Sequence, residues 1–356
     1  MSDSYSAVSD GHANGAATNG ATVVSVAPGP GRVGRHPDLS IIRDEMTRLE
    51  SKLRDMSDVP YPPLAEVLTH LVSAGGKRLR PAVALLVGKI YACDTERALS
   101  LAAGLEMLHT ATLVHDDMID QAVLRRGMPT LNTVWTPVAT ILAGDYMFGR
   151  AARYVAETEN PRVITLFAEA LKTIVGGELQ QLYNRPVGLP SQEAYFQRIY
   201  GKTAALFTTA AEAAGELGGA STEIVAKLHD YGYNLGMAFQ IIDDILDFTG
   251  AQAEVGKPVG GDLREGIVTL PVMLYAQEQP DSPYLHRYFD AGTGADRREA
   301  VDALVAAVRE SAAIEAARSV AADFVARANE DLSVLPDVPA RRVLEDIGAY
   351  TVVRHE

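Results

Sequence analysis

Apolar residues recur at helical spacing along most of the chain. Ile41, Ile42, Met46 and Leu49 form a stripe with a period near 3.6 residues, which is typical of a helix with one buried face. The segment 82–91 is almost wholly apolar and predicts a helix that is buried on all sides. Convincing strand alternation is absent from the sequence. The pattern predicts an all-α fold, one large helical bundle around a central cavity.

Helices and their breaks follow from the same pattern. Further helices are predicted over 64–71, 98–120, 138–154, 163–183, 194–212 and 223–248, with another beginning at Thr269. Gly75 and Gly76 are a stop signal, whereas Gly176 and Gly177 lie inside a predicted helix and permit close packing or a kink. Residues 1–37 are rich in Ser, Ala, Gly, Asn and Thr and predict a disordered tail before a single domain, 38–356.

The composition limits the classes of protein to which this chain can belong. Hydrophobic residues make up 47% of the 356-residue chain, which is enough for a large core, and the net charge is −14. No basic cluster is large enough to indicate nucleic-acid binding. The single cysteine, Cys93, excludes an internal disulfide and a cysteine metal site and favours the cytoplasm. Neither a secretory signal nor a membrane-spanning run is visible.

Two clusters of aspartates interrupt apolar helices. Each has acids at positions i, i+1 and i+4: Asp116, Asp117 and Asp120 in the first, and Asp243, Asp244 and Asp247 in the second. Like charges four residues apart destabilise an isolated helix, so a cation should compensate them. Carboxylates without cysteine suit a hard cation such as Mg²⁺, which keeps positions for water or phosphate oxygens. The clusters predict two or three Mg²⁺ ions that hold a diphosphate; surface salt bridges are the alternative interpretation.

Basic residues occur at several separated places. Gly76, Lys77, Arg78 and Arg80 form a basic start to a predicted helix, a position suited to an anion. Weaker candidates are Arg125 and Arg126 in the loop after the first acids, Lys202 beside Thr203, and Lys257. Each is also compatible with an ordinary solvated turn, and His109 and His115 are compatible with structural histidines. Together they indicate two anionic ligands, one bound through metal ions and one bound directly.

The chemistry indicated is metal-assisted departure of a diphosphate. The sequence has no catalytic-triad signature, P-loop or dinucleotide-binding glycine pattern. Mg²⁺ acts on such a leaving group as a Lewis acid. The apolar faces of the helices would enclose a dry cavity for a hydrocarbon tail and a carbocation.

The order and spacing of these motifs resemble the trans-isoprenyl diphosphate synthases, the polyprenyl synthetase family. The resemblance runs from about Ile41 to Arg354 and rests on Gly75 to Pro81, both aspartate clusters, Arg125 to Gly127, Gly201 to Thr203, Gly256-Lys257 and Gly261 to Leu263. It implies an isoprenoid synthase fold and a homodimeric prenyltransferase. It also implies Mg²⁺-dependent head-to-tail condensation of isopentenyl diphosphate with an allylic diphosphate, without nucleic acid and without stable membrane insertion.

The resemblance also assigns roles to residues. The catalytic set is Asp116, Asp117, Asp120, Lys202, Asp243 and Asp244, and the metal ligands are these aspartates together with Asp247. Isopentenyl diphosphate is expected at Gly76, Lys77, Arg80, His109 and Arg126. The allylic diphosphate is expected at Arg125, Lys202, Thr203, Gln240 and Lys257. The released diphosphate is the expected proton acceptor.

Two positions bear on the substrate and the product. Many members of the family have a lysine that contacts the allylic diphosphate where this chain has Ile267, which we interpret as a mark of a subgroup. Residues four and five before the first aspartate face the growing tail in this family, and here they are Thr112 and Ala111. With Leu108 one turn deeper, they leave room for growth, so we expect an all-trans product of C20 or longer.

Four alternatives differ from this expectation in identifiable features. A farnesyl-length synthase would share every motif but stop growth earlier. A terpene cyclase would usually show a different second metal motif and has no need of the basic segment Lys77 to Arg80. A non-catalytic regulatory subunit of a heteromeric prenyl synthase typically loses aspartates that this chain keeps. A purely structural bundle has no reason to place six acids in apolar surroundings.

Overall fold

The computed structural model describes residues 36–73, 75–125, 128–183, 188–250, 259–292 and 294–354. Residues 34–356 form one compact unit. The predicted tail, apart from its last two residues, lies outside the described residues, and so do Arg126 and Lys257. None of the helices in the described ranges combines the length and the apolar character needed to cross a bilayer.

The first half of the unit contains seven helices, one 3₁₀ turn and one hairpin in the described residues. They are η1 (Leu39–Ile42), α1 (Arg43–Arg54), α2 (Pro62–Ser73), α3 (Leu79–Ile90), α4 (Thr95–Ile119), β1 (Leu124–Arg125), β2 (Met128–Pro129), α5 (Leu131–Val134), α6 (Pro137–Ala156) and α7 (Pro161–Tyr183). The two strands pair antiparallel. This hairpin is compatible with the absence of strand alternation in the sequence, because two-residue strands are too short to show alternation.

In the second half, helices are the only regular secondary structure among the described residues. Its elements are α8 (Gln192–Ile199), the π-helical turn η2 (Tyr200–Ala204), α9 (Ala205–Leu217), α10 (Thr222–Thr249), α12 (Gly261–Arg264), α13 (Leu270–Glu278), α14 (Pro283–Asp290), α15 (Ala295–Glu310), α16 (Ala313–Leu332) and α17 (Pro339–Val353). The predicted all-α fold is confirmed.

Capping residues fix where the long helices begin. The Asp94 carboxylate accepts a hydrogen bond from the Arg97 amide at 3.0 Å and opens α4. The Ser221 hydroxyl accepts one from the Ile224 amide at 3.4 Å and opens α10. These bonds satisfy amides that have no partner inside the helix. They set the register of the two helices that carry the aspartates.

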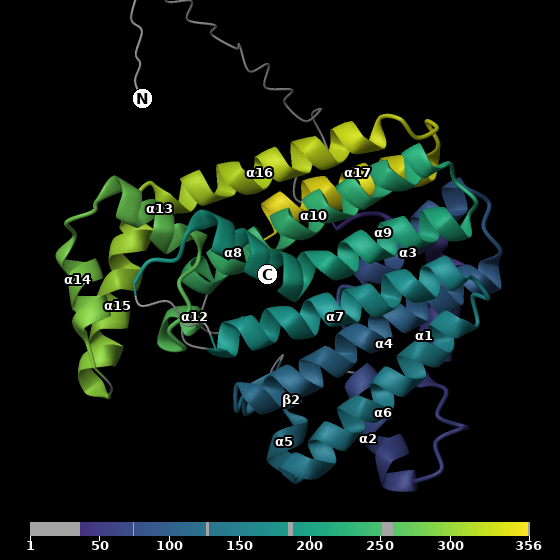
Figure 1. The fold of residues 1–356 in the computed structure, drawn as a ribbon, viewed down its shortest axis with the longest axis horizontal. Helices are drawn as coiled ribbons and strands as arrows, with labels where there is room; N and C mark the ends of the chain where they lie inside the picture. Colours follow the sequence, from purple (N-terminus) through teal and green to yellow (C-terminus); the bar gives the residue numbers. More distant parts are fainter. Residues whose placement is uncertain are drawn as a thin grey trace, which may run out of the picture. The chain divides into compact units, whose positions relative to one another are not determined.

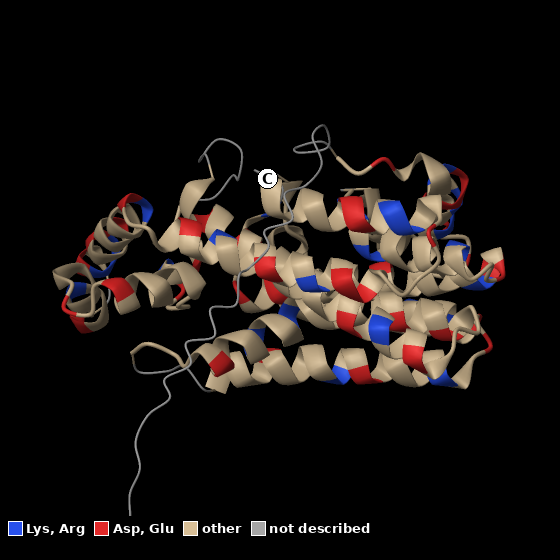
Figure 2. Cartoon of the chain, turned by 90° about the horizontal axis from the view of Figure 1, so that it is seen from above, with Lys and Arg blue, Asp and Glu red and all other residues tan. Residues whose placement is uncertain are grey.

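The aspartate helices occupy central positions. α4 packs along α6, and α10 packs between α9 and α16 (Figure 1). In α3 every residue from Pro81 to Gly88 is buried, as the apolar run predicted, but Lys89 is exposed and Ile90 is half-buried at the end of the helix. Figure 2 shows acidic and basic residues interspersed over many helices, which agrees with the absence of a basic face in the sequence.

The predicted helix over 194–212 is interrupted. It divides into α8 and α9 at the π-helical turn η2, which contains Lys202 and Thr203. A Cβ on Gly201 would lie 3.5 Å from the Cα of Gly177 and 3.3 Å from the carbonyl oxygen of Thr173, so α7 and η2 approach closely at two glycines. Gly177 thus serves close packing, one of the two roles expected for it.

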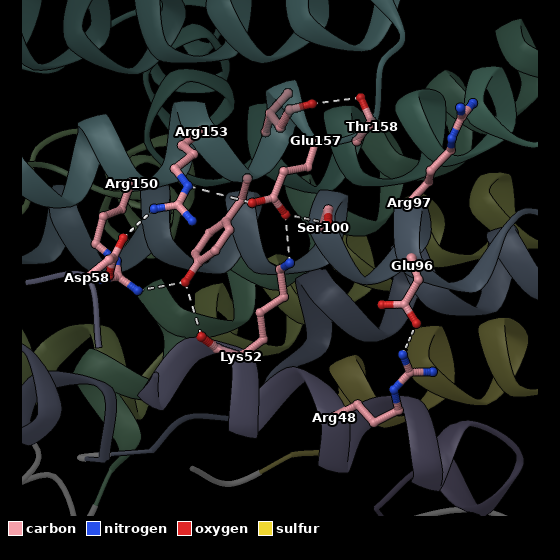
Figure 3. Close-up of polar contacts among 12 residues, drawn as sticks. Arg48, Lys52, Asp58, Glu96, Arg97, Ser100, Arg150, Arg153, Glu157 and Thr158 are labelled. Atoms are coloured by element: carbon pink, nitrogen blue, oxygen red, sulfur yellow. Dashed lines mark hydrogen bonds and ion pairs between the residues drawn. The ribbon is translucent and has the colours of Figure 1, made fainter. Parts of the chain in front are cut away.

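A polar network, which we call the clasp, joins the end of α1 and the following loop to α4 and α6 (Figure 3). It comprises Lys52, Asp58, Ser100, Arg150, Arg153, Tyr154 and Glu157. The buried Arg150 guanidinium donates to Asp58 at 2.6 Å and to the Tyr154 hydroxyl at 2.8 Å. Lys52 donates to Glu157 at 2.7 Å. Each acid of the clasp therefore has a basic partner within the protein.

Candidate active site

The first acid wall, Asp116, Asp117 and Asp120, lies at the C-terminal end of α4. Asp117 is buried and accepts a hydrogen bond at 2.7 Å from Nε of Arg125, which lies in β1. Asp116 is half-buried and Asp120 is exposed. Neither of these two carboxylates accepts a hydrogen bond from a residue in the described part of the chain. The wall thus has one acid held by the protein and two that remain available to a ligand.

The second acid wall, Asp243, Asp244 and Asp247, lies in the last turns of α10. The protein holds each of its carboxylates. Asp244 is buried and accepts hydrogen bonds from Gln240 at 2.8 Å and from the Tyr195 hydroxyl at 2.7 Å. Asp243 pairs with Arg354 at 2.6 Å. The carboxylate of Asp247 accepts the backbone amides of residues 261 and 262 at 2.9 and 3.2 Å.

Lys202 lies in the π-helical turn η2, and its side chain is exposed. The acids that act on its charge include Asp116 and Asp120 of the first wall. Burial lowers the pKa of Lys202, but the nearby acids, led by Asp262 and Glu178, outweigh that effect and raise it. Lys202 is therefore a charged ammonium group that acts on the first acid wall and on Asp262.

The acidic side chains of the two walls are not fully balanced by basic side chains. Burial, together with the charge of Glu178, raises the pKa of Asp116 to about 7, although Lys202 partly opposes this rise. Burial, followed by the charge of Asp262, also raises the pKa values of Asp244 and Asp247. Such shifts mean that ionised carboxylates are held here at a cost that an added cation would relieve.

The donor set fits a hard divalent ion. Within the described ranges, no three His, Cys, Asp or Glu side chains form a ready-made metal site. The walls instead offer carboxylate oxygens from two helices, with insufficient ligands at one point for an all-protein cage. That arrangement matches Mg²⁺, which binds one or two carboxylates and completes its shell with water or phosphate oxygens.

The basic segment before α3 divides into two kinds of residue. Arg78 has a left-handed backbone, with φ of 48°, and its guanidinium donates to Glu50 at 2.7 Å and to Glu106 at 2.5 Å. The Arg78 guanidinium is therefore engaged in ion pairs within the protein. Lys77 is exposed, and Arg80 lies 3.3 Å from His109 Nε2. A small cavity of about 60 Å³ is lined by Arg78, His109, Asp117 and Arg125, among other residues. Its neighbourhood brings together predicted residues from three separate segments.

The predicted allylic residues converge on the second wall. Thr203 donates to the Gln240 carbonyl oxygen, and Gln240 in turn donates to Asp244. A cavity of about 730 Å³ opens beside them, lined by residues that include Asp120, Tyr195 and Ile267. The predicted sites at Arg126 and Lys257 lie outside the described residues.

Several residues at the site did not stand out in the sequence. Glu178, Tyr195, Arg198 and Arg354 all contact or electrostatically influence the predicted residues. Glu178 could have been found, because it follows the glycine pair that lets α7 approach η2. Arg354 carries no such signal, since only the fold brings it across 111 residues to Asp243.

Comparisons with known proteins agree with this geometry. The family model "Polyprenyl synthetase" matches residues 61–308. Heptaprenyl diphosphate synthase component 2 of Geobacillus stearothermophilus is 37% identical over 311 residues, which cover 87% of this chain and 96% of that protein. The crystal structure of a decaprenyl diphosphate synthase from Rhodobacter capsulatus is 36% identical with a TM-score of 0.80, covering 89% of this chain and 98% of that one.

A third relative was solved with ligands. The crystal structure of a polyprenyl synthase from Caulobacter crescentus, complexed with calcium and isoprenyl diphosphate, is 35% identical. Its TM-score is 0.79, and the match covers 90% of this chain and 99% of that one.

The chain therefore belongs to the polyprenyl synthetase family. It is a prenyltransferase, a trans-polyprenyl diphosphate synthase, with the isoprenoid synthase fold. The family predicted from the sequence is confirmed. The interpretations as a terpene cyclase or as a non-catalytic subunit are set aside.

Proposed function

We propose that the protein condenses isopentenyl diphosphate head-to-tail with an allylic diphosphate in a Mg²⁺-dependent reaction. One observation carries the proposal: each wall contains carboxylates with raised pKa values, Asp116 in the first and Asp244 and Asp247 in the second, so the site lacks positive charge that metal ions would supply. Asp116, Asp120 and Asp243 would hold the ions, and Asp117, Asp244 and Asp247 would position these ligands. When bound, Mg²⁺ supplies Lewis-acid stabilisation of the departing diphosphate.

The protein's own residues orient the two substrates. Lys202, Thr203 and Gln240 hold the allylic diphosphate at the second wall, and Arg125 and Lys257 join them. Gly76, Lys77, Arg80, His109 and Arg126 hold isopentenyl diphosphate. Arg80 suits this role, because its guanidinium lies over the Phe207 ring at 4.7 Å and next to His109. Apolar helix faces exclude water from the carbocation.

We further propose that the product is a long all-trans polyprenyl diphosphate rather than a farnesyl-length one. The named relatives make heptaprenyl and decaprenyl diphosphates. Thr112 lies one turn before Asp116 on the same helix face and is half-buried, so it can line a channel below the metals. Leu108 and Ala111 are fully buried and lie on the face of α4 that meets α6.

Two variants test the product length. Thr112→Phe should shorten the product, because an aromatic ring below Asp116 would block the growing tail. Ala111→Phe should also shorten it, but with a lower melting temperature, since overpacking a filled core costs roughly 1–3 kcal/mol. Chromatography of the hydrolysed products measures the length. An unchanged distribution in both variants would remove these positions from the channel.

A homodimer in the cytoplasm completes the proposal. The location rests on the single cysteine. The dimer is supported by exposed apolar stripes: Val138, Ile141 and Leu142 on α6, and Val175, Leu179 and Leu182 on α7. Sedimentation of the purified protein should give twice the chain mass. A monomer at micromolar concentration would contradict this part.

The central experiment is an incubation with Mg²⁺, isopentenyl diphosphate and each allylic diphosphate from C5 to C20. We expect turnover that chelation abolishes and Mg²⁺ restores. The starter with the highest kcat/KM identifies the allylic substrate, and the product size identifies the length. Absence of turnover with every starter would contradict the proposed reaction.

A further inference from the structure

Arg198, near the end of α8, lies at the edge of the larger cavity. The cavity of about 730 Å³ is lined by Asp120 from one wall and by Tyr195, Arg198 and Ile267 from the other side. The guanidinium of Arg198 lies over the Tyr195 ring, 5.4 Å from its centroid. Tyr195 in turn donates to Asp244. A cation is therefore held one side chain away from the second acid wall.

The position of Arg198 is fixed by the backbone on the opposite side. Its Nη2 donates to the carbonyl oxygen of Val268 at 3.1 Å. Val268 follows Ile267. The backbone amide of Ile267 donates a hydrogen bond to the backbone carbonyl oxygen of Asp262 at 2.8 Å. The guanidinium head thus lies next to residue 267, and an arginine with one N–H bond made still has donors to offer a ligand.

The charge balance of the cavity distinguishes Arg198 from its neighbour Arg264. Arg264 also lines the cavity, but it pairs with Asp302 at 2.5 Å. No carboxylate in the described ranges forms an ion pair with Arg198. Arg198 therefore has no ion-pair partner among the described residues, although its charge acts on the buried carboxylate of Asp244.

We propose that Arg198 binds the diphosphate of the allylic substrate and supplies, from α8, positive charge beside the apolar residue Ile267. This inference rests on the proposed function for the identity of the ligand. It adds a substrate-binding residue that neither the motifs nor the relatives indicate. Guanidinium favours this role because its planar fork matches phosphate oxygens.

Kinetics with both substrates test the assignment. Arg198→Gln should raise the KM for the C15 allylic diphosphate by about 10-fold, the effect of losing a charge-assisted hydrogen bond. The KM for isopentenyl diphosphate should stay within about twofold. Arg198→Lys should lie between the wild type and Arg198→Gln. Arg264→Gln is the matched control, because it removes a cation from the same cavity that already has a partner.

A second substitution separates binding from structure. Ile267→Lys places a cation at the neighbouring position, so the double variant Arg198→Gln/Ile267→Lys should recover most of the lost affinity. A fold defect would not be repaired in this way. Melting temperatures of all variants accompany the kinetics.

Direct binding distinguishes failure of this inference from failure of the proposed function. Calorimetric titration with inorganic diphosphate and Mg²⁺ should show about 10-fold weaker binding for Arg198→Gln, whether or not the protein turns over. An active wild type whose Arg198→Gln variant keeps its KM and diphosphate affinity would overturn the inference. Equal rises in both KM values, or equal effects of Arg264→Gln, would also overturn it.

Discussion

The clasp and the two acid walls use the same residue types with opposite charge balance. In the clasp, Asp58 pairs with Arg150 and Arg153, and Glu157 pairs with Lys52. In the walls, acids outnumber the cations near them, and the pKa of Asp116 rises to about 7. The contrast shows that a cluster of acidic residues does not by itself indicate a metal site. A metal site is indicated where the fold supplies too few basic groups to balance the acids, because a bound cation must then supply the missing charge.

The largest effect should come from the walls. Asp116→Asn should lower kcat by about 10²–10³-fold, because it removes a ligand for the ions that stabilise the leaving diphosphate. Its melting temperature should not fall, since the carboxylate that is lost is half-buried and only partly compensated by Lys202. Steady-state kinetics and thermal melting measure both. Asp58→Asn is the control in the clasp, with a normal kcat and a lower melting temperature. Equal losses of activity in both variants would break the comparison.

The clasp should respond in stability instead. Arg150→Ala should lower the free energy of unfolding by roughly 2 kcal/mol, less than a fully buried pair, because Asp58 is 36% exposed. The activity per folded molecule should be unchanged. Urea unfolding gives the value, and Arg150→Lys should recover part of it. A change below about 0.5 kcal/mol would mean that the clasp is not a stabilising element.

The pH dependence of metal binding sharpens the contrast. Asp116 has a pKa of about 7 in the folded protein and 3.8 as its model value, so between these values the folded state holds a proton that the unfolded state has released. Without metal, this group therefore lowers stability as the pH rises from about 4 to 7. Mg²⁺ must displace that proton at low pH.

We therefore expect Mg²⁺ to stabilise the folded protein more at pH 8 than at pH 6. The gain in the free energy of unfolding should differ by about 1 kcal/mol between the two pH values, with a correspondingly larger rise in melting temperature at pH 8. Scanning calorimetry with and without chelator measures it. Asp116→Asn should reduce the difference between the two pH values. A Mg²⁺ effect that is equal at both pH values would argue against these carboxylates as the titrating ligands.

The smallest effect should come from an exposed pair beside the clasp (Figure 3). Arg48 and Glu96 form an ion pair, but their side chains are 47% and 72% exposed. Arg48→Ala should change the free energy of unfolding by no more than about 0.5 kcal/mol, because solvent screens such a pair. Urea unfolding beside Arg150→Ala provides the scale. A loss as large as that of Arg150→Ala would show that exposure does not separate the two pairs.

The sequence predicts the walls better than their surroundings. The i, i+1, i+4 spacing of the aspartates is a local pattern that is visible in the sequence itself. The two helices predicted to carry the aspartates are present in the structure as α4 and α10. The three cations of the basic segment look alike in sequence, yet Arg78 turns into the core because its left-handed backbone directs it to Glu50 and Glu106. Arg198 and Arg354 could not be predicted, since long-range packing alone brings them to the second wall.

The π-helical turn η2 has a consequence for how this part of the chain can vary. A π turn holds one residue more than an α turn. Loss of a single codon within 200–204 would let α8 and α9 join into the regular helix that the apolar pattern suggests. The core face of α9 would be kept, but α8 would rotate by about 100°. Tyr195 and Arg198 would then turn away from Asp244, so a deletion that is silent for packing would disconnect one side of the second wall.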